Sequence, residues 1–557
     1  MRATRRPVSA CGANLVRTLA SILFLLLLLL PNGGCAEKRA DPNLLVTSRV
    51  FAVTEGQVEF LDPNLISETA GNRVGMQMFE PLVTIAPGSE LPVPAQAERW
   101  TVSDDKRTYT FVLRDGLTWS DGVPISTADF VYSYERLLNP NTQSKAAQLL
   151  GNIEGAEAYN AGKTSDFKTV GVRALDPKTL EIRFTGPAPY FLDLLVNPNF
   201  APVPKHVIDR VGPQWTRPDH IVVNGAFRLT TWVSGERIEM VRNERYWDAK
   251  NVWLDGVTFY ETQSESTAQT WYDAGKVQWS PGLIPLTAVR GLLSSGRTDF
   301  HIDPLMCVYY YCFNTTRPPF DDARVRRAFN QSVDKPLLVR QVLGMGQKPA
   351  THLVPPMFMG SRGYGEVTGD PFDPSRARKT LDSVGYNTSS PFPAVTLDYN
   401  TFEGHRIIAE FIQKALAGTL DMKLELANME WKSLLQKVHA GDFQIARGSW
   451  CADFNDPEDF LRVFHSRHEH NYAKYSSPEY DALLDALAKT GDQPERNRLA
   501  AEAEAMLNRD QPIIPLYFYT RGHMLRPFVH GVEPDSQDRH YFKYVWFGAE
   551  DAKAAPP

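Results

Sequence analysis

The feature that most constrains this chain is a long body that offers no internal break. Its 557 residues contain no tandem repeat and no low-complexity linker, and a chain of this length exceeds what one ordinary hydrophobic core accommodates. A hydrophobic content of 43% is ample for a large buried interior. Patterns typical of strands and of helices alternate along the chain. We therefore predict a mixed α/β fold with two or three domains.

Local patterns place several elements in the first part of the chain. Residues 44–53, "LLVTSRVFAV", alternate as a strand does, and residues 61–83 predict a turn and then a helix that ends near Phe79. Residues 108–113 also alternate, and Asp115 and Gly116 follow them, which predicts a hairpin with its turn at these two residues. Ser126 stands where a helix N-cap is expected.

The later part of the chain continues the alternation. The pattern predicts a strand at 397–400 before a helix at 405–417. It also predicts a strand at 480–489 before a helix at 495–508.

The N-terminus has the composition of an export signal. Arginines precede an almost unbroken apolar run, Leu19–Leu30, and small residues lead from it to Cys35. The run is too short for a comfortable membrane span. Because the residues before Cys35 resemble a bacterial lipoprotein cleavage site, we expect residues 1–35 to be a signal peptide and Cys35 to be lipidated, with ordinary cleavage as the alternative. The mature protein would then work outside the cytoplasm.

Charge and cysteine content narrow the class further. The formal net charge is −6, with acids and bases interspersed, which argues against a nucleic-acid-binding face. Beyond the N-terminal segment the chain has three cysteines, Cys307, Cys312 and Cys451. In an oxidising compartment two of the three are expected to pair, but their spacing does not identify the pair.

One acidic segment raises a question about ligand binding. Residues 447–461 read "RGSWCADFNDPEDFL", so Asp453 follows Trp450 and Cys451 directly. A carboxylate in an apolar neighbourhood is expensive to bury. Either the segment is an acidic turn before a helix, or the carboxylate of Asp453 binds a cation.

The histidines of the chain suggest an enzyme only weakly. Residues 465–470, "HSRHEH", hold three histidines, yet no zinc-protease motif, serine-hydrolase motif or complete phosphate-binding glycine loop occurs. We interpret this segment as a solvated polar loop. We therefore expect no catalytic residues, no metal and no cofactor, and an extracellular metal-dependent hydrolase is the weaker alternative.

Five segments, in order, carry a resemblance to a known family. The chain is similar to the oligopeptide-binding branch of the extracytoplasmic peptide-binding proteins that feed ABC importers, the peptide/nickel solute-binding protein family. The segments are Ala97–Pro140, Tyr309–Lys335 ("YYYCFNTTRPPFDDARVRRAFNQSVDK"), Glu430–Leu435, Ala446–Leu461 and Ile513–Val532.

The resemblance implies a bilobal periplasmic-binding-protein-like α/β fold with an additional third domain. Residues 41–80, 204–306 and 521–557 would form a discontinuous N-terminal lobe, and 81–203 the extra domain. Residues 307–520 would form the second lobe. The crossovers near Met306 and Thr520 would be the hinge.

The resemblance also assigns roles to residues around the acidic segment. Asp453 would bind the α-ammonium of a peptide, and the backbone of Ser449 and Cys451 would pair with the peptide as an added strand. The peptide carboxylate would be bound by Arg447, His405 and Lys437. Trp431, Trp450 and Tyr310 would line side-chain pockets.

The cysteines are assigned in the same way. Cys307 and Cys451 match a disulfide of close relatives. Cys312 departs from the family pattern and would be a free thiol, a competitor for pairing or a pocket position.

The function implied is a high-affinity receptor that binds short peptides and delivers them to an ABC transporter permease. The same fold binding a dipeptide, a murein peptide, nickel, haem or a sugar is the alternative. We expect a monomer, without nucleic acid, in the periplasm or at the cell surface and anchored to the membrane by the lipid at Cys35.

Overall fold

A large mixed sheet organises the chain in the computed structural model, which describes residues 49–548 apart from 90, 283, 358–363 and 365–366. The sheet has eleven strands in the order β15-β14-β16-β12-β17-β11-β1-β10-β9-β8, with β13 paired to β17 beside this path. The strands are β1 Val50–Glu55, β8 Phe227–Val233, β9 Arg237–Arg242, β10 Gly256–Glu261, β11 Trp279–Pro281, β12 Phe300–Phe313, β13 Lys348–Pro349, β14 Val395–Asn400, β15 Leu424–Met429, β16 Ile445–Cys451 and β17 Ile513–Leu525.

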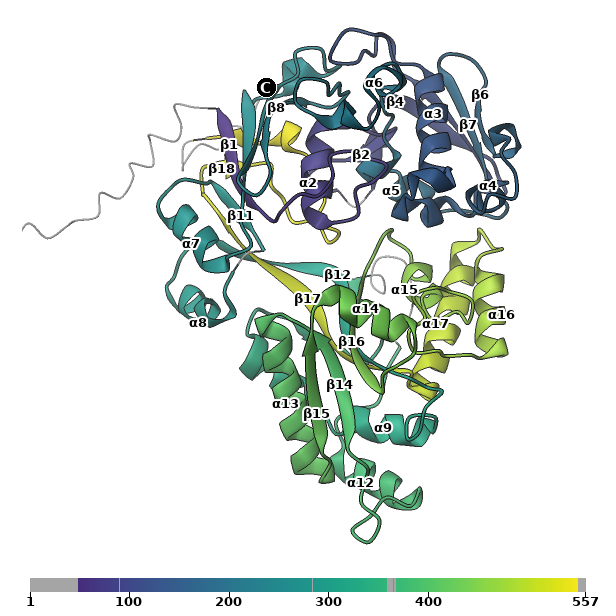
Figure 1. The fold of residues 1–557 in the computed structure, drawn as a ribbon, viewed down its shortest axis with the longest axis vertical. Coiled ribbons are helices and arrows are strands. Elements are labelled where there is room, and N and C mark those ends of the chain that lie inside the picture. The colour runs from purple at the N-terminus through teal and green to yellow at the C-terminus, as the bar shows by residue number, and fades with distance from the viewer. Residues whose placement is uncertain (1–48, 90, 283, 358–363, 365–366, 549–557) are drawn as a thin grey trace, which may run out of the picture. The chain divides into compact units, whose positions relative to one another are not determined.

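Two long antiparallel strands, β12 and β17, join the two halves of this sheet (Figure 1). At one end they adjoin the strands of the N-terminal half through β11, and at the other β12 pairs with β16. Their register shifts between Pro304 and Val308, where three residues of β12 bulge out of the pairing. A bulge bends a strand and interrupts its ladder. The chain therefore changes direction within these two strands.

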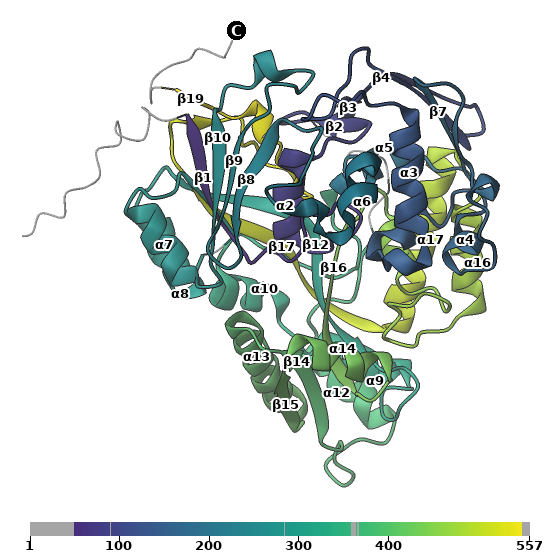
Figure 2. The same cartoon turned by 45° about the horizontal axis from the view of Figure 1, so that its top comes forward.

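Residues 81–203 contain a separate four-stranded antiparallel sheet in the order β4-β5-β7-β6. Figures 1 and 2 both show this sheet grouped with α3 and α4. Its strands are β4 Ala97–Val102, β5 Thr108–Leu113, β6 Val172–Ala174 and β7 Thr179–Arg183. Two short pairs complete the strands of the described part, β2 Val83–Ile85 with β3 Pro92–Pro94 and β18 Val529–His530 with β19 Trp546–Phe547.

Helices cover these sheets. The α-helices are α2 Thr69–Met78, α3 Thr127–Leu138, α4 Ala156–Asn160, α5 Phe191–Leu194, α6 Lys205–Val211, α7 Glu265–Asp273, α8 Leu286–Ser294, α9 Ala323–Gln331, α10 Lys335–Leu338, α12 Pro374–Ser383, α13 Glu403–Leu420, α14 Trp431–His439, α15 Glu458–Arg462, α16 Pro478–Leu487 and α17 Gln493–Asp510. Within the described residues no helix is long and apolar enough to cross a membrane. The predicted signal, residues 1–35, lies outside them.

Several local predictions are confirmed. The helix expected to end near Phe79 is α2, and the N-cap at Ser126 is part of a capping box with Asp129. The strand at 397–400 and the helix at 405–417 are β14 and α13. Of the first predicted strand, the described part is β1.

Two local predictions are wrong. The hairpin that contains β5 pairs it with the preceding β4, so its turn lies at 103–107, where Lys106 has φ +58°, and not at Asp115–Gly116. Residues 478–487 form the helix α16 and not a strand. Its buried Tyr480, Leu484 and Leu487 recur at helical spacing, which the sequence interpretation overlooked.

The second half of the sheet is packed on both faces. Along β12, Tyr309, Tyr311 and Phe313 enter one hydrophobic cluster, which α13 covers. Val308, Tyr310 and Cys312 enter the other, which α16 and α17 cover. This alternation follows from the period of two along a strand. It fixes which side chains of the neighbouring β16 share a face.

Candidate functional site

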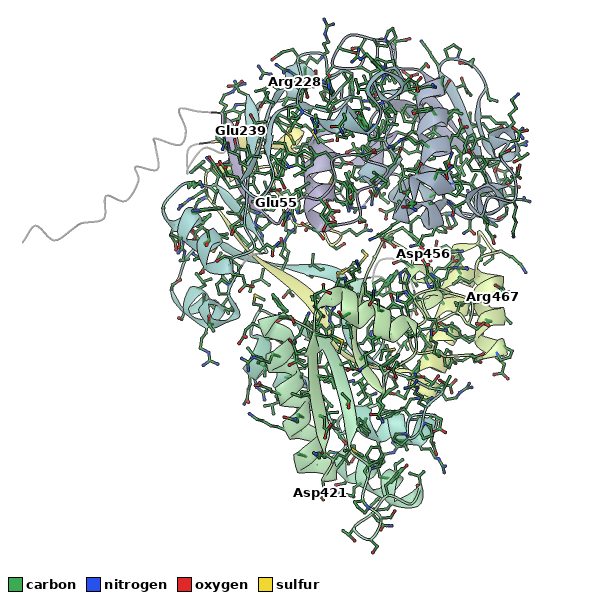
Figure 3. All side chains as sticks on the ribbon, viewed as in Figure 1. Glu55, Arg228, Glu239, Asp421, Asp456 and Arg467 are labelled. Atoms are coloured by element: carbon green, nitrogen blue, oxygen red, sulfur yellow. A yellow bond between two sulfur atoms is a disulfide. The ribbon has the colours of Figure 1, made fainter. Side chains whose placement is uncertain are left out.

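A cavity of about 720 Å³ lies where β12 bulges. Several parts of the chain meet around it, among them α2 with the end of β1, α5, the bulge of β12, the end of β16, the adjoining part of β17 and the segment after β18. Its lining includes Glu55, Arg73, Asp193, Leu305, Met306, Cys307, Cys451, Ala452, Asp453, Arg521, Asp538 and Arg539. Figure 3 labels Glu55, at the end of β1, and Asp456, beside α15.

The arginines of the cavity wall are already paired. Arg73 binds Glu55 and Asp538, and Arg521 binds Asp538 and, at 3.0 Å, Asp303. Burial alone would raise the pKa of Asp303, but hydrogen bonds and charge from His523 and Arg521 lower that pKa to about 2. The Asp303 carboxylate therefore stays ionised. The arginines are not free to bind an anion.

The third arginine of the wall is paired as well. Arg539 lies 2.8 Å from Asp193 and 3.0 Å from Asp535. Of the four acids that line the cavity, Asp453 is the one that no basic side chain of the described residues pairs with. The cavity thus presents one uncompensated carboxylate.

The carboxylate of Asp453 is held in a poorly solvated position. Burial raises the pKa of Asp453 to about 6. The Asp459 carboxylate accepts a hydrogen bond from the Asp453 backbone N–H at 3.1 Å. Trp450 donates its indole N–H to the same oxygen at 3.0 Å.

A second, smaller cavity adjoins Asp453. Its volume is about 100 Å³, and Asp453 lines both cavities. Trp450, Phe454, Asp459 and Tyr190 also line it, and the rings of Tyr190 and Phe454 are stacked at 4.2 Å. The predicted pocket residue Trp450 is therefore at a cavity beside Asp453.

Strand β16 has an open edge next to the larger cavity. It pairs with β12 over its whole length, but with β14 only at Ile445 and Ala446. The Ala452 N–H donates to the Met306 carbonyl of β12 at 2.9 Å. Because backbone groups alternate in direction along a strand, those of Ser449 and Cys451 point away from β12. Among the described strands, none pairs with β16 on that side at Ser449 or Cys451.

The structure contains the disulfide Cys307–Cys451, which the family resemblance implies. The two cysteines face each other across β12 and β16 with a Cα–Cα distance of 4.0 Å, as in a pair without backbone hydrogen bonds. The bond therefore ties the strand that leads to Asp453 to the bulge of β12. Cys312 is the free cysteine of the described residues, and it is buried in the core.

Arg447 and His405 lie together, but away from the cavity lining. Arg447 donates to the Tyr519 hydroxyl at 3.0 Å and lies 4.9 Å from the centre of the Tyr309 ring, while its Nε has no hydrogen-bond partner. The Tyr309 hydroxyl is 3.3 Å from His405 Nδ1. Burial, followed by the charge of Arg447, lowers the pKa of His405 to about 3. The imidazole is therefore neutral at physiological pH.

The remaining predicted site residues are dispersed. Lys437 binds the buried Asp398 at 2.7 Å, Trp431 is 46% exposed at the start of α14, and Tyr310 is buried in the core. Arg447, Ser449 and Cys451 share one face of β16, whereas Trp450 and Tyr310 lie on the opposite face. The structure thus joins Asp453, Cys451 and Trp450 at the cavities and does not bring the others to them.

The histidine segment does not form a metal site. Within the described residues no group of three or more His, Cys, Asp or Glu is arranged to hold a metal ion. The interpretation of 465–470 as a solvated loop is wrong for His465, which is buried between Asp481 at 3.7 Å and Asp485 at 3.5 Å.

Sequence reasoning missed Asp459 and the paired arginines of the cavity wall. Asp459 had a detectable signal, since it stands in the same acidic segment as Asp453, six residues later. Arg73, Arg521 and Arg539 had none, because each also pairs with an acid hundreds of positions away, namely Asp538, Asp303 and Asp193 respectively, which it meets only in the fold.

Comparison with known proteins gives the family. The model of the bacterial extracellular solute-binding proteins, family 5 (Middle), matches residues 92–471. The periplasmic oligopeptide-binding protein OppA of Salmonella typhimurium is 36% identical over 499 residues, which cover 88% of this chain and 91% of that protein. The probable deoxycholate-binding periplasmic protein YgiS of Escherichia coli is 35% identical over 498 residues, with 88% and 91% covered.

A solved structure agrees over the same extent. The crystal structure of Haemophilus influenzae OppA in complex with the peptide RPPGFSPFR superposes with a TM-score of 0.78 at 28% identity, covering 90% of this chain and 99% of that one. The α/β periplasmic-binding-protein-like fold expected from the resemblance is thereby confirmed. The chain belongs to the bacterial extracellular solute-binding proteins of family 5.

Proposed function

We propose that this protein is an extracytoplasmic receptor that binds short peptides and delivers them to the permease of an ABC transporter. The observation that carries the proposal is Asp453, a poorly solvated carboxylate without a basic partner among the described residues, at the end of a strand with an open edge. An α-ammonium would neutralise this carboxylate in a region of low dielectric. The peptide-binding proteins among its relatives support the choice of ligand.

The open edge of β16 explains how such a receptor would bind many sequences. A peptide strand added beside Ser449 and Cys451 would be bound through backbone hydrogen bonds, which do not depend on side chains. Ser449 and Cys451 are on the same face of β16 as Arg447 and lie between Arg447 and Asp453 in the chain. The ligand would therefore lie along β16 with its N-terminus at Asp453.

Arg447 is the proposed partner of the peptide carboxylate. It lies six residues before Asp453, a span of at most about 20 Å for extended chain. An extended peptide has the same rise per residue, so a peptide of about six residues would span this distance and reach both charges. His405, being neutral, would contribute a hydrogen bond and not a charge, and Lys437 would first have to leave Asp398. Trp431, Trp450 and Tyr310 remain proposed pocket residues.

The domain division follows the same proposal. Residues 41–80, 204–306 and 521–557 would form one lobe, 307–520 the other and 81–203 the extra domain. The four-stranded sheet falls within the last range, and the bulge of β12 falls at the proposed boundary near Met306. Strands β12 and β17 would act as the hinge, and the ligand would favour the closed form by contacting both lobes.

The family supports a solute-binding role and an extracellular location, and we extend it. Residues 1–35 would direct export and Cys35 would carry the lipid anchor, so that the receptor works as a monomer in the periplasm or at the cell surface. It would have no catalytic activity and need no cofactor.

Calorimetric titration tests the choice of ligand. The protein is first unfolded and refolded to remove bound ligand, and then titrated with tri- to pentapeptides and with the same peptides N-acetylated. We expect saturable binding of the free peptides alone, since acetylation removes the ammonium. If no peptide binds but a bile acid, nickel, haem or an oligosaccharide does, the proposed ligand is wrong.

The substitution Asp453→Asn should weaken binding of free peptides by about 30-fold or more, because it leaves the ligand ammonium without a charged partner. Asp442→Asn is the matched control: Asp442 is exposed, lies on the same segment of the chain and is paired with Arg317. Titration of both variants with one tripeptide measures the difference. Equal affinities for the two variants would remove Asp453 from the site.

A further inference from the structure

We propose that Asp459 makes this receptor select peptides whose first residue has a cationic side chain. The inference rests on the proposed role of Asp453 as the partner of the peptide N-terminus. Its basis is the number of charges around the smaller cavity and the fact that Asp453 lines both this cavity and the larger one.

The charges around the smaller cavity do not balance. Glu458 lies 2.8 Å from Arg496 and accepts a hydrogen bond from Arg462 at 2.9 Å. Arg496 also lies 2.9 Å from Asp456. These two acids and two arginines compensate one another, so they leave no positive charge for other groups.

Asp453 and Asp459 remain as two surplus acids. Among the described residues neither carboxylate has an ion pair with a lysine, arginine or histidine. On the other side of Asp453, the charge of Arg539 is taken by Asp193 and Asp535. His468 adds no charge, since burial lowers its pKa to about 4. An empty site must therefore hold protons on this pair, or a ligand must bring positive charge to it.

One α-ammonium is not enough to neutralise two carboxylates. Asp459 is only 6% exposed, and one of its carboxylate oxygens accepts hydrogen bonds from the Trp450 indole and the Asp453 backbone N–H. Both acids line the same cavity, about 100 Å³ in volume, walled by Tyr190, Phe454 and Trp450. Because a side chain leaves the Cα that carries the ammonium, the first side chain of a peptide bound at Asp453 is the group nearest this cavity.

The polarity of this cavity favours an amine or guanidinium over an alkyl chain. An alkyl group there would leave Asp459 either buried and charged or protonated, whereas a lysine or arginine side chain would pair with it. The stacked rings of Tyr190 and Phe454 give the methylene groups of such a side chain an apolar wall. The ligand class is therefore a peptide with lysine or arginine at its N-terminus.

The test compares Lys-Ala-Ala with norleucine-Ala-Ala, which has the same chain length and lacks the side-chain ammonium. Titration of the full chain at pH 7.5 gives the ratio of the two affinities. We expect the lysine peptide to bind about tenfold more tightly or better, the scale of one additional desolvated charge pair. In the variant Asp459→Asn the ratio should fall to near one, with the lysine peptide bound more weakly and the norleucine peptide bound at least as tightly as by the unmodified protein. Asn retains an oxygen for Trp450 and the Asp453 N–H.

Asp442→Asn serves as the charge-matched control, and its ratio should equal that of the unmodified protein. A ratio near one in the unmodified protein, or one unchanged by Asp459→Asn, overturns the inference while peptide binding itself stands. If neither free tripeptide binds, the proposed function fails and the inference falls with it. If Asp459→Asn does not fold, the unmodified protein is titrated at pH 5, where protonation of Asp459 should abolish the preference; a ratio that does not depend on pH also overturns it.

Discussion

At the proposed site, two individual residues destabilise the ligand-free protein. Asp459 is buried and Asp453 lies half-buried beside it, neither has a basic partner among the described residues, and desolvation raises the pKa of both. Two such carboxylates disfavour the folded state once they ionise. Residues that await a ligand often conflict with stability in this way. Their environment can therefore be tested without any ligand.

Replacing Asp459 with Asn should stabilise the ligand-free protein above neutral pH. The folded-state pKa of each acid lies above its unfolded value, so the folded protein holds protons that the unfolded chain has released, and stability falls as pH rises between the two values. For Asp453 this window runs from 3.8 to about 6. Denaturant unfolding at pH 7.5 should show a gain on the order of 1–3 kcal/mol for Asp459→Asn.

At about pH 4, near the unfolded pKa of aspartate, the variant and the unmodified protein should converge, because both acids are then largely protonated in the folded state. A variant that is less stable than the unmodified protein at pH 7.5 would contradict the raised pKa of Asp459.

The proposed role of Arg447 can be tested by changing the C-terminus of the peptide. Amidation of the peptide C-terminus removes the carboxylate and should weaken binding to the unmodified protein by about tenfold. In Arg447→Met the amidated and free peptides should bind alike, since the charge they are proposed to meet is gone. The four titrations form a double-mutant cycle. A coupling energy of zero would assign Arg447 to packing against Tyr309 alone.

Among the elements, β16 shows how closely the second half of the sheet is fitted around the site. Gly448 stands opposite Tyr310 of β12, and a Cβ at Gly448 would lie 2.4 Å from the Tyr310 ring. That ring is buried, with Phe464 at a centroid distance of 6.1 Å, so it has little room to move. The glycine therefore permits the close approach of the two strands.

Gly448→Ala should destabilise the protein by about 1–3 kcal/mol, the usual range for overpacking a close-packed core. Gly418→Ala is the control: Gly418 lies exposed in α13 with nothing within 4 Å of its would-be Cβ, so alanine should be neutral or stabilise by up to about 1 kcal/mol. Thermal unfolding of the two variants measures the difference. Similar thermal unfolding midpoints for the two variants would mean that the Tyr310 ring can move aside.

The elements were largely predictable where the pattern is local. Helix α2, the cap of α3 and strand β14 follow from short-range periodicity and capping residues. The prediction failed at α16, since ten residues with few turn signals were assigned the wrong period. It failed also at the β4–β5 hairpin, where Asp115–Gly116 is a turn but does not join two paired strands.

The site was predictable only in part, for a similar reason. Asp453 and Trp450 are neighbours in the sequence, so one segment brings them to one place. The paired state of Arg73 and the neutral state of His405 depend on burial and on partners far away in the chain. Sequence patterns reveal neither the burial of a side chain nor its partners from distant parts of the chain.

At the scale of the whole molecule, β12 and β17 are the strands that run continuously between the two halves of the sheet, among the strands that the structure describes. The cavity, the disulfide and the paired Arg521 all lie at the bulge between them. A ligand bound at Asp453 is thus placed to bias the angle between the halves. With β12 and β17 as the proposed hinge, closure of the two lobes should require the α-ammonium of the peptide, as binding does.

Small-angle X-ray scattering should show a smaller radius of gyration when a saturating free tripeptide is added, because closure brings the two lobes together. The N-acetylated peptide should produce no change, and neither should the free peptide with Asp453→Asn. A radius that stays constant while calorimetry shows saturation would separate binding from closure and contradict the hinge at β12 and β17.

The open edge of β16 also has a consequence for aggregation. A strand with unpaired backbone groups is a template for edge-to-edge association with other chains. Here the unpaired stretch is short, ends beside the charges of Arg447 and Asp453, and adjoins a recess and not an outer face of the sheet. Another folded sheet would bring its neighbouring strands and its side chains on both faces into this recess, whereas a single extended chain needs less room. The recess should therefore favour a peptide over the edge of a second receptor.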